Sequence, residues 1–375
     1  MDNNKLLPEG FCDLIGDEAR INNDTSYKLI SFFQGFGYDL VKTPLVELEN
    51  TLKDYQKTTQ KSFQIFDINS GQNLMFRSDI TAQISRLVET RLKDHQFPLR
   101  LCYLGDVLKI SSRAIQSDRQ ITQAGIELIG SDNILKSASE IIELTINSLN
   151  KIDVENLTID FSIPNFLKLL LEELNLGDDR VRKAIEEKNI SNIKDLTSHY
   201  ADSLVNIALE IKNPQEIRKN LVNLKISSNL LDKFDNLLLI IDKINYKHSA
   251  IEILVNIFDD LEFSYHDNIG FSIFTKESLL PIARGGLYEI KKGVMAAGSS
   301  IYINLIKDIL LKSDQCNVKK ILISDDISQK QLDLLKKDGY ITIKSLCDNS
   351  IESLQEEAKL LNINFIYFNS AIKNI

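Results

Sequence analysis

Polar side chains interrupt an otherwise apolar stretch at residues 119–130, RQITQAGIELIG. The alternation of apolar and polar residues predicts a β-strand in which Gln123, Gly125 and Glu127 share one face. A carboxylate that is buried without a partner costs several kcal/mol, so this face is either exposed to solvent or awaits a cationic ligand. The glycine between the two polar residues allows another group to approach the backbone closely. The strand by itself leaves both interpretations open, an exposed sheet face and a binding site.

A second polar group, Ser78-Asp79-Ile80-Thr81, follows a predicted hairpin over residues 61–77. A helix with a regular apolar face is predicted to follow over about 80–92. Ser78 or Asp79 is a suitable N-cap for this helix, and such a cap contributes about 1 kcal/mol. For Asp79, the sequence therefore allows both a capping role and a role in ligand binding.

The composition limits the class of protein. The chain has 375 residues, a net charge of −9 and 43% hydrophobic residues, which is ordinary for a globular protein of two or three domains. The negative charge does not favour a general affinity for nucleic acid, although it does not exclude a local basic patch. The 4 cysteines and 4 histidines are scattered, so no metal site is expected. No apolar run is long enough for a membrane span or a signal peptide, and we expect a cytoplasmic protein without a membrane partner.

The remaining periodicities predict how these polar groups are positioned. The block over about 177–260 is charged and lacks an alternating strand pattern, which indicates a helical insertion carried on a sheet domain. Residues 316–375 alternate between strand and helix patterns, which predicts a small, mostly parallel α/β unit. The other predicted elements are helices over 17–35, 132–150, 164–174 and 296–312, and strands over 99–103, 157–161, 262–275 and 279–284, with a linking segment at 105–118.

Residues 6–312 resemble, in colinear order, the catalytic core of histidyl-tRNA synthetases, a class II synthetase fold. GFGYDLVKTPLVELEN is similar to the first class motif, which builds the dimer interface in that family. SFQIFDINSGQNLMFRSDITAQISRLV resembles the segment that holds the amino group of the amino acid. The strand over 119–130 is similar to the family's stretch Arg-x-Arg-Gln-Phe-x-Gln-x-Gly-x-Glu. The segment LLPEGFCDLIGDEA also matches the family's opening.

This resemblance implies an α+β fold. Its core is an antiparallel sheet of the class II synthetase type, covered by helices and carrying the helical insertion at about 177–260. We expect this core to span residues 1–315. The unit over 316–375 then resembles a truncated anticodon-binding domain.

The resemblance also implies a pocket for histidine. Asp79 and Thr81 stand where the α-amino group is held, and a carboxylate pairs well with an ammonium group. Gln123 and Glu127 would line the ligand, with the Glu127 carboxylate accepting a hydrogen bond from an imidazole N–H. Tyr288 matches a tyrosine of the family's Gly-Gly-Arg-Tyr-Asp segment.

Several positions depart from the family pattern. Lys109 stands in place of the arginine that grips the α-phosphate of ATP, so bidentate recognition is lost. Leu305 replaces the arginine for the γ-phosphate, and Ile269 replaces a further catalytic arginine. Attack on ATP requires positive charge placed in advance, so we expect no catalytic residues and no activation of histidine. Two paired tyrosines of the family are also replaced, by Ile273 and Phe274.

A synthetase core without these arginines resembles the regulatory subunit of ATP phosphoribosyltransferase. In that family the subunit forms homodimers within a hetero-octamer, together with a short catalytic subunit. The complex performs the first step of histidine biosynthesis and is inhibited by histidine. The resemblance implies no cofactor and no tRNA partner. The alternatives are an active histidyl-tRNA synthetase and a synthetase paralogue recruited to RNA or to the modification of another protein.

Overall fold

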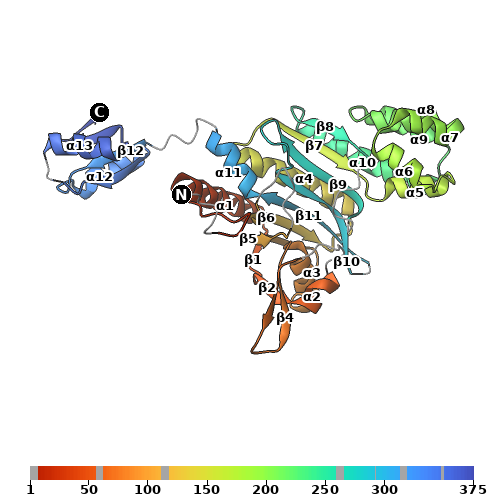
Figure 1. Ribbon diagram of the computed structural model, residues 1–375, viewed down its shortest axis with the longest axis horizontal. Coiled ribbons are helices and arrows are strands. Elements are labelled where there is room, and N and C mark those ends of the chain that lie inside the picture. Colours follow the sequence, from red (N-terminus) through yellow and green to blue (C-terminus); the bar gives the residue numbers. More distant parts are fainter. Residues whose placement is uncertain are drawn as a thin grey trace. The chain divides into compact units, whose positions relative to one another are not determined.

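The computed structural model describes residues 7–55, 62–110, 118–258, 266–291, 293–312, 319–347 and 350–375. The chain forms two compact units, Met1–Leu310 and Leu311–Ile375 (Figure 1). The boundary expected at 315/316 lies at residues 313–318, outside the described residues.

The first unit is built on an eight-stranded sheet with the strand order β1-β5-β6-β11-β10-β9-β7-β8. The strands pair in an antiparallel manner except at the two edges, where β1 is parallel to β5 and β8 is parallel to β7. This sheet confirms the predicted α+β fold of the class II type. The strands are β1 Asp39–Val41, β5 Leu99–Leu108, β6 Gln120–Ile129, β7 Leu157–Ser162, β8 Glu252–Val255, β9 His266–Thr275, β10 Ala283–Lys291 and β11 Val294–Tyr302.

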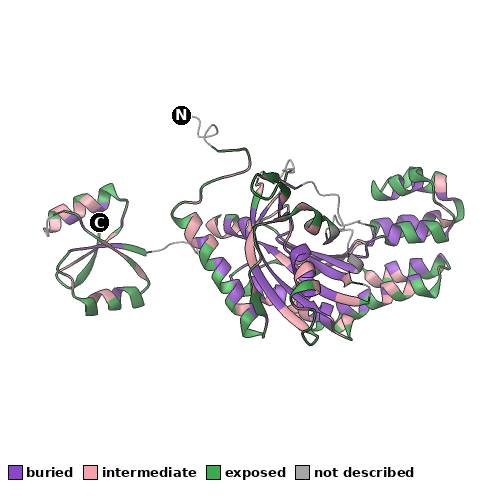
Figure 2. Ribbon diagram, turned by 90° about the horizontal axis from the view of Figure 1, so that it is seen from below, coloured by how far each residue is buried: buried purple, intermediate pink, exposed green. Residues whose placement is uncertain are grey.

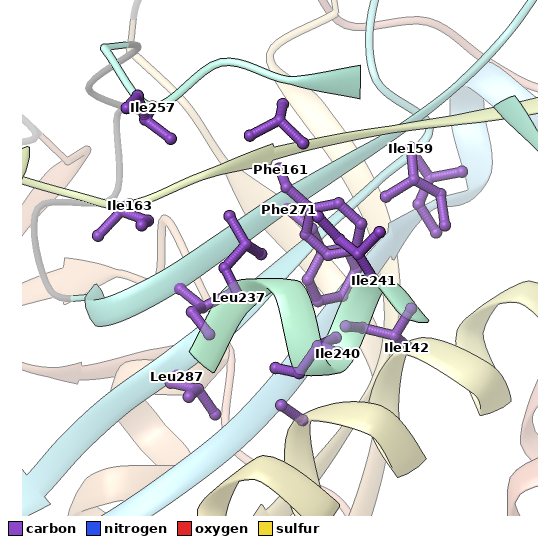
Figure 3. Packing of buried hydrophobic residues seen from close by; sticks show 14 of the residues in the cluster. Ile142, Ile159, Phe161, Ile163, Leu237, Ile240, Ile241, Ile257, Phe271 and Leu287 are labelled. Carbon is purple, nitrogen blue, oxygen red and sulfur yellow. The ribbon is translucent and has the colours of Figure 1, made fainter. Parts of the chain in front are cut away.

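The two faces of this sheet bury different clusters. Helices α1 (Asp17–Gly35), α4 (Ile134–Lys151) and α10 (Ser228–Lys247) contribute to the main hydrophobic core on one face. Figure 3 shows part of this core, where Phe161 and Phe271 pack with their ring centroids 6.5 Å apart. Buried residues accordingly run along the strands, while the helices keep an exposed side (Figure 2). Burial of these apolar faces supplies the main driving force for folding of the unit.

The opposite face carries a smaller cluster next to α3 (Thr81–Thr90). Its members include Ile80, Ile84, Tyr103 and Tyr288. A three-stranded sheet of β2 (Val46–Leu48), β4 (Gln72–Phe76) and β3 (Gln64–Asp67) precedes α3, with α2 (Glu49–Tyr55) between β2 and β3. The hairpin predicted at 61–77 is therefore present as β3 and β4, apart from residue 61, which is not described.

The segment 177–260 is helical only as far as Lys247. Its helices are α6 Asp179–Glu186, α7 Ile190–Thr197, η2 Ser198–Tyr200, α8 Ala201–Leu209, α9 Pro214–Asn223 and α10; α5 (Phe166–Glu173) precedes it. Strand β8 then pairs with β7 at the edge of the main sheet, contrary to the expectation of a segment without strands. The four residues of β8 are too few to show a periodic pattern, and pairing with β7 decides their conformation.

The prediction of a helix over 296–312 is wrong for residues 296–302. Residues 294–302 form β11, and α11 (Ile303–Lys312) begins only after it. The run Ala296-Ala297-Gly298 carries no strand preference, but it lies between β6 and β10 and is hydrogen-bonded on both sides. Strand β5 likewise continues to Leu108, into the segment predicted as a link. The strand predicted at 279–284 is wrong over 279–282, because β10 begins only at Ala283 and continues to Lys291. Residues 111–117 and 262–265 of the predicted elements lie outside the described residues.

The second unit is a small α/β layer. Strands β12, β13 and β14 are parallel, as the alternating pattern predicts. A final strand, β15, adds in an antiparallel manner and is not predicted from the sequence. The elements are β12 Lys319–Ile323, α12 Gln329–Lys337, β13 Tyr340–Lys344, α13 Ile351–Leu360, β14 Phe365–Phe368 and β15 Ala371–Asn374.

Candidate functional site

Glu127 lies in β6, two residues before its end at Ile129, and is only 1% exposed, so the interpretation as a solvent-facing sheet surface is wrong. Its Oε1 accepts a hydrogen bond from the Thr81 hydroxyl at 3.0 Å. Its Oε2 accepts a hydrogen bond from the Tyr288 hydroxyl at 2.7 Å. Strand β6, the start of α3 and strand β10 therefore meet at this one carboxylate.

Small residues on the neighbouring strands make room for these side chains. Gly298 of β11 is paired with Glu127, and a Cβ atom on this glycine would lie 1.7 Å from Glu127 Oε2. The close approach predicted at Gly125 is made by Tyr103 of β5, whose hydroxyl would lie 2.3 Å from an added Cβ. The Tyr103 hydroxyl also shares a hydrogen bond of 2.7 Å with Ser300.

The electrostatic setting of Glu127 is unusual for a carboxylate. Burial raises the pKa of Glu127 from 4.5 to about 8, opposed by the hydrogen bonds from Tyr288 and Thr81 and assisted by the negative charge of Asp79. Burial also raises the pKa of Tyr103 and of Tyr288 well above the ordinary tyrosine value. Within the described residues the hydrogen-bond partners of Glu127 are both neutral hydroxyls. Neither of these hydrogen bonds brings the positive charge that would stabilise an ionised carboxylate. A ligand with a cationic group would supply that charge, and an N–H group would donate a further hydrogen bond.

Asp79 has the local role that its position before a helix predicts. Its Oδ1 accepts a hydrogen bond of 3.2 Å from the backbone N–H of Thr81. The formal N-cap residue of α3 is Ile80, whose side chain cannot bond the helix. Asp79 is half-buried, and its negative charge raises the pKa of Glu127. It therefore orders the first turn of α3 and also belongs to the polar cluster formed with Thr81, Glu127 and Tyr288.

Gln123 lies on the same strand as Glu127, four residues earlier, and is 2% exposed. Its Oε1 is buried and finds no hydrogen-bond partner within the described part of the chain. An unmade hydrogen bond of this kind costs about 1–3 kcal/mol, which a donor group on a ligand would recover. The structure thus joins Thr81, Glu127 and Tyr288 directly and places Gln123 on the same strand face.

The positions that the resemblance assigns to cationic groups make structural contacts. Lys109 Nζ lies 5.6 Å from the ring centroid of Tyr302. Leu305 is partly buried and packs against both clusters of the first unit. Ile269 is 2% exposed and belongs to the main core.

Asn304, next to Leu305, cross-links α11 to the start of β6. Its Oδ1 accepts a hydrogen bond from the backbone N–H of Thr122 at 2.8 Å, and its Nδ2 donates to Asp118 at 3.0 Å. Neither Tyr103 nor Ser300 was identified from the sequence as part of this site. Tyr103 could have been predicted only from the register of β5 against β6, which places it opposite Gly125.

Comparison with known proteins places this geometry in a family. The sequence model of the family described as histidyl-tRNA synthetase matches residues 10–306, which include every residue of the cluster. The chain belongs to the histidyl-tRNA synthetase family. Solved structures agree with this fold: a histidyl-tRNA synthetase from Nostoc sp. PCC 7120 matches with a TM-score of 0.76 and 15% identity, covering 97% of this chain and 91% of that one.

Within the histidyl-tRNA synthetase family, the chain is similar to regulatory subunits of ATP phosphoribosyltransferase. The protein of that name from Rhodospirillum rubrum is 27% identical over 349 residues, which cover 91% of this chain and 90% of the relative. The one from Gluconobacter oxydans is 27% identical over 375 residues, covering 98% and 97%. A solved ATP phosphoribosyltransferase regulatory subunit/histidyl-tRNA synthetase from Bacillus halodurans C matches with a TM-score of 0.75 and 20% identity, covering 95% and 97%.

The described residues include no helix with the length and apolar character of a membrane span. They also contain no group of three or more histidine, cysteine, aspartate or glutamate residues that could hold a metal ion.

Proposed function

We propose that this chain is the non-catalytic regulatory subunit of an ATP phosphoribosyltransferase. It acts with a short catalytic subunit in the first step of histidine biosynthesis and confers feedback inhibition by histidine. The names of the relatives from Rhodospirillum rubrum and Gluconobacter oxydans support this role.

The observation that carries the proposal is a buried polar cluster around Glu127 combined with uncharged residues at two positions where the resemblance expects arginines. Glu127 is buried and held by Thr81 and Tyr288, as a selective binding site requires. Leu305 and Ile269 offer no charge to a triphosphate, and both pack in the hydrophobic cores. Preorganised positive charge is usually the largest contribution to catalysis of phosphate chemistry, so this arrangement favours binding without reaction.

Histidine fits the cluster as a ligand. Its ammonium group would lie near Asp79 and Thr81, and the buried Gln123 Oε1 would accept a further hydrogen bond. An imidazole N–H would donate to Glu127. Histidine must bind one quaternary state better than the other to act as an inhibitor, and a coupling free energy of about 1–3 kcal/mol is typical of such effectors.

The assembly follows from the same proposal. The chain would form a homodimer, and dimers would combine with the short catalytic subunit into a hetero-octamer in the cytoplasm. Binding of tRNA is not part of this role, and no cofactor is required.

Reconstitution tests the proposal. The purified chain is mixed with a short-form catalytic subunit, and the formation of phosphoribosyl-ATP is measured with and without histidine. We expect the two proteins to co-elute, the activity to depend on this chain, and histidine to inhibit it. If the chain neither co-elutes with the catalytic subunit nor changes its activity, the proposal is wrong.

An active histidyl-tRNA synthetase is the second candidate, because the family model carries that description. It predicts histidine-dependent exchange of pyrophosphate into ATP. We expect no exchange above background from the purified chain, and a burst of adenylate formation would favour this candidate instead.

A further inference from the structure

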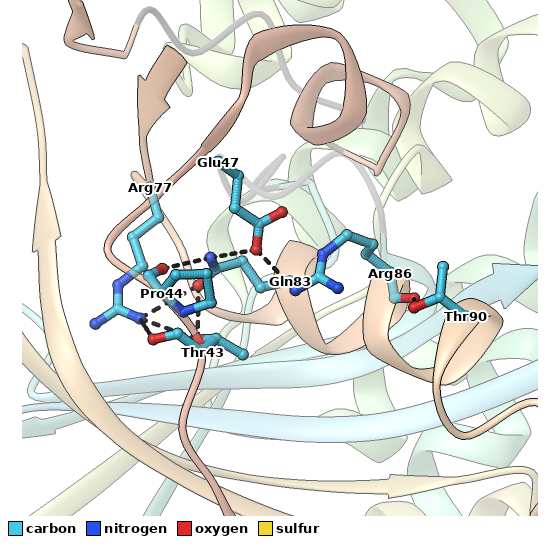
Figure 4. Close-up of polar contacts among 7 residues, drawn as sticks. All are labelled: Thr43, Pro44, Glu47, Arg77, Gln83, Arg86 and Thr90. Atoms are coloured by element: carbon cyan, nitrogen blue, oxygen red, sulfur yellow. Dashed lines mark hydrogen bonds and ion pairs between the residues drawn. The ribbon is translucent and has the colours of Figure 1, made fainter. Parts of the chain in front are cut away.

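The side-chain amide of Gln83, in the first half of α3, is completely buried (Figure 4). Its Oε1 accepts a hydrogen bond from the Thr43 hydroxyl at 2.7 Å. Its Nε2 donates to the Pro44 carbonyl and to Glu47 Oε1, both at 2.7 Å. Both ends of the amide are thus bonded to one segment, which leads into and includes the start of β2.

Two arginines also take part in this contact between α3 and the segment Thr43–Glu47, the junction. Arg86, one turn further along α3, bonds Glu47 Oε1 at 2.8 Å, and both side chains are largely buried. Arg77, which precedes the site residues, donates from Nη1 to the Thr43 carbonyl at 3.1 Å and to Gln83 Oε1 at 3.3 Å. Hydrogen bonds to charged groups are worth more than neutral ones, so the junction is a stiff contact.

The junction lies close to the ligand cluster along the chain and along the helix. Gln83 follows Thr81 by two residues, and a helix rises 1.5 Å per residue, so the two lie about 3 Å apart along the axis. Thr81 is the first residue of α3 and bonds Glu127. Asp79 bonds the backbone of Thr81 immediately before it. A shift of α3 would therefore move Asp79 and Thr81, the two residues proposed to hold the ammonium group of the ligand.

We propose that Gln83 is a positioning residue that fixes the first turn of α3 against the segment Thr43–Glu47 and so couples ligand binding at Thr81 and Glu127 to the placement of β2. The ligand in this proposal is histidine, so in that respect it rests on the proposed function. A ligand that tightens the contact between Thr81 and Glu127 would then also restrain β2 through Gln83.

The alternative is that Gln83 only stabilises the fold. Loss of the Gln83 hydrogen bonds would then lower the stability of the whole first unit, and the ligand site would be affected no more than the rest of that unit. Amide hydrogen exchange separates the two interpretations, because it reports the opening of individual segments rather than global unfolding alone.

Gln83→Met is the decisive variant, because methionine keeps the volume and removes every hydrogen bond of the amide. Thr43→Val is a milder second variant that removes only the hydroxyl bonded to Gln83 and Arg77. Thr90→Ala is the matched control: Thr90 lies at the other end of α3, is exposed, and its hydroxyl donates to the carbonyl of Arg86 in its own helix (Figure 4).

Hydrogen exchange is measured in the full-length chain with and without histidine, and histidine affinity is measured by calorimetry. In the free Gln83→Met protein we expect amides of residues 81–85 to exchange about tenfold faster or more, while those of α4 are unchanged. Histidine affinity should fall by about tenfold to a hundredfold, and by about threefold in Thr43→Val. Histidine should slow exchange over residues 46–48 in the wild-type and Thr90→Ala proteins but not in Gln83→Met.

Wild-type exchange rates and affinity in Gln83→Met and Thr43→Val would overturn the proposal. An equal increase in exchange over α3 and α4 would also overturn it, in favour of a purely stabilising role. If the wild-type chain does not bind histidine, the effector part of the proposed function fails. The exchange rates of the free proteins over residues 81–85 would still decide whether Gln83 positions the helix.

Discussion

Glu127 is a carboxylate with only 1% of its surface exposed to water. It is held by hydroxyl groups from Thr81 and Tyr288, and the nearby charge of Asp79 is negative. Burial makes ionisation unfavourable and the charge of Asp79 adds to this effect, while the two hydrogen bonds oppose it; the pKa of Glu127 rises to about 8. A ligand that brings an N–H donor or a positive charge reverses this preference, so ligand binding and proton loss at Glu127 are linked.

The raised pKa predicts a pH-dependent stability. The folded state binds the Glu127 proton more tightly than the unfolded state, so this contribution is fully present below the unfolded pKa and is lost as the pH rises through about 8. Relative to the Glu127→Gln variant, the wild-type free energy of unfolding should fall with rising pH, by up to roughly 1.4 kcal/mol per pH unit. Urea denaturation of both proteins at several pH values measures this difference, and a difference that is constant with pH would contradict it.

Glu127→Ala tests the assignment of the ligand. The substitution removes the acceptor for the imidazole N–H and both hydroxyl contacts. We expect calorimetry to detect no histidine binding, while co-elution with the catalytic subunit persists. The control is Glu186→Ala, because Glu186 lies in α6, away from the cluster, and pairs with Arg182 at the surface. Normal histidine binding by Glu127→Ala would remove Glu127 from the site.

At the scale of elements, β11 shows how a sheet accommodates a buried carboxylate. Its Gly298 lies directly opposite Glu127, and the carboxylate occupies the space that any larger side chain would need. The strand is flanked by β6 and β10, so it cannot move aside without breaking two sets of backbone hydrogen bonds.

Gly298→Ala should therefore displace the Glu127 side chain. Overpacking of this kind costs about 1–3 kcal/mol, and the displaced carboxylate should also lose its bond to Tyr288. Denaturation with urea and calorimetry with histidine measure the two effects. Gly177→Ala is the control, because an added Cβ there meets nothing within 4 Å. Equal stability and affinity of both variants would contradict the crowding at Gly298.

On the scale of the whole molecule, the ligand cluster and the small α/β layer belong to different compact units. The second unit has hydrophobic clusters of its own, on both sides of its sheet. Every residue proposed to bind histidine lies before Leu310. The first unit should therefore keep its site when the second is removed.

A chain that ends at Lys312, the last residue of α11, tests this separation. We expect it to bind histidine with an affinity within about twofold of the full-length protein, since every residue proposed to bind histidine remains in it. Calorimetry measures the affinity, with the full-length chain as the control. A loss of binding in a truncated chain that remains folded would show that the second unit contributes to the site.

The sequence by itself determined the features that depend on local pattern. The alternation around Gly125 identified β6, and helical periodicity identified α1, α3 and α4. Repeated alternation of strand and helix identified the parallel layer of the second unit. Turn and capping residues are local as well, which is why the hairpin and the role of Asp79 before α3 were predictable.

Only the tertiary structure decided that the polar face of β6 is buried. The two hydroxyls that hold Glu127 come from residues 46 and 161 positions away along the chain. The same non-local pairing made β11 a strand despite its run of small residues and added β8 to the edge of the sheet. Hydrogen bonds and close packing between distant segments outweigh weak local preferences, and no short stretch of sequence contains them.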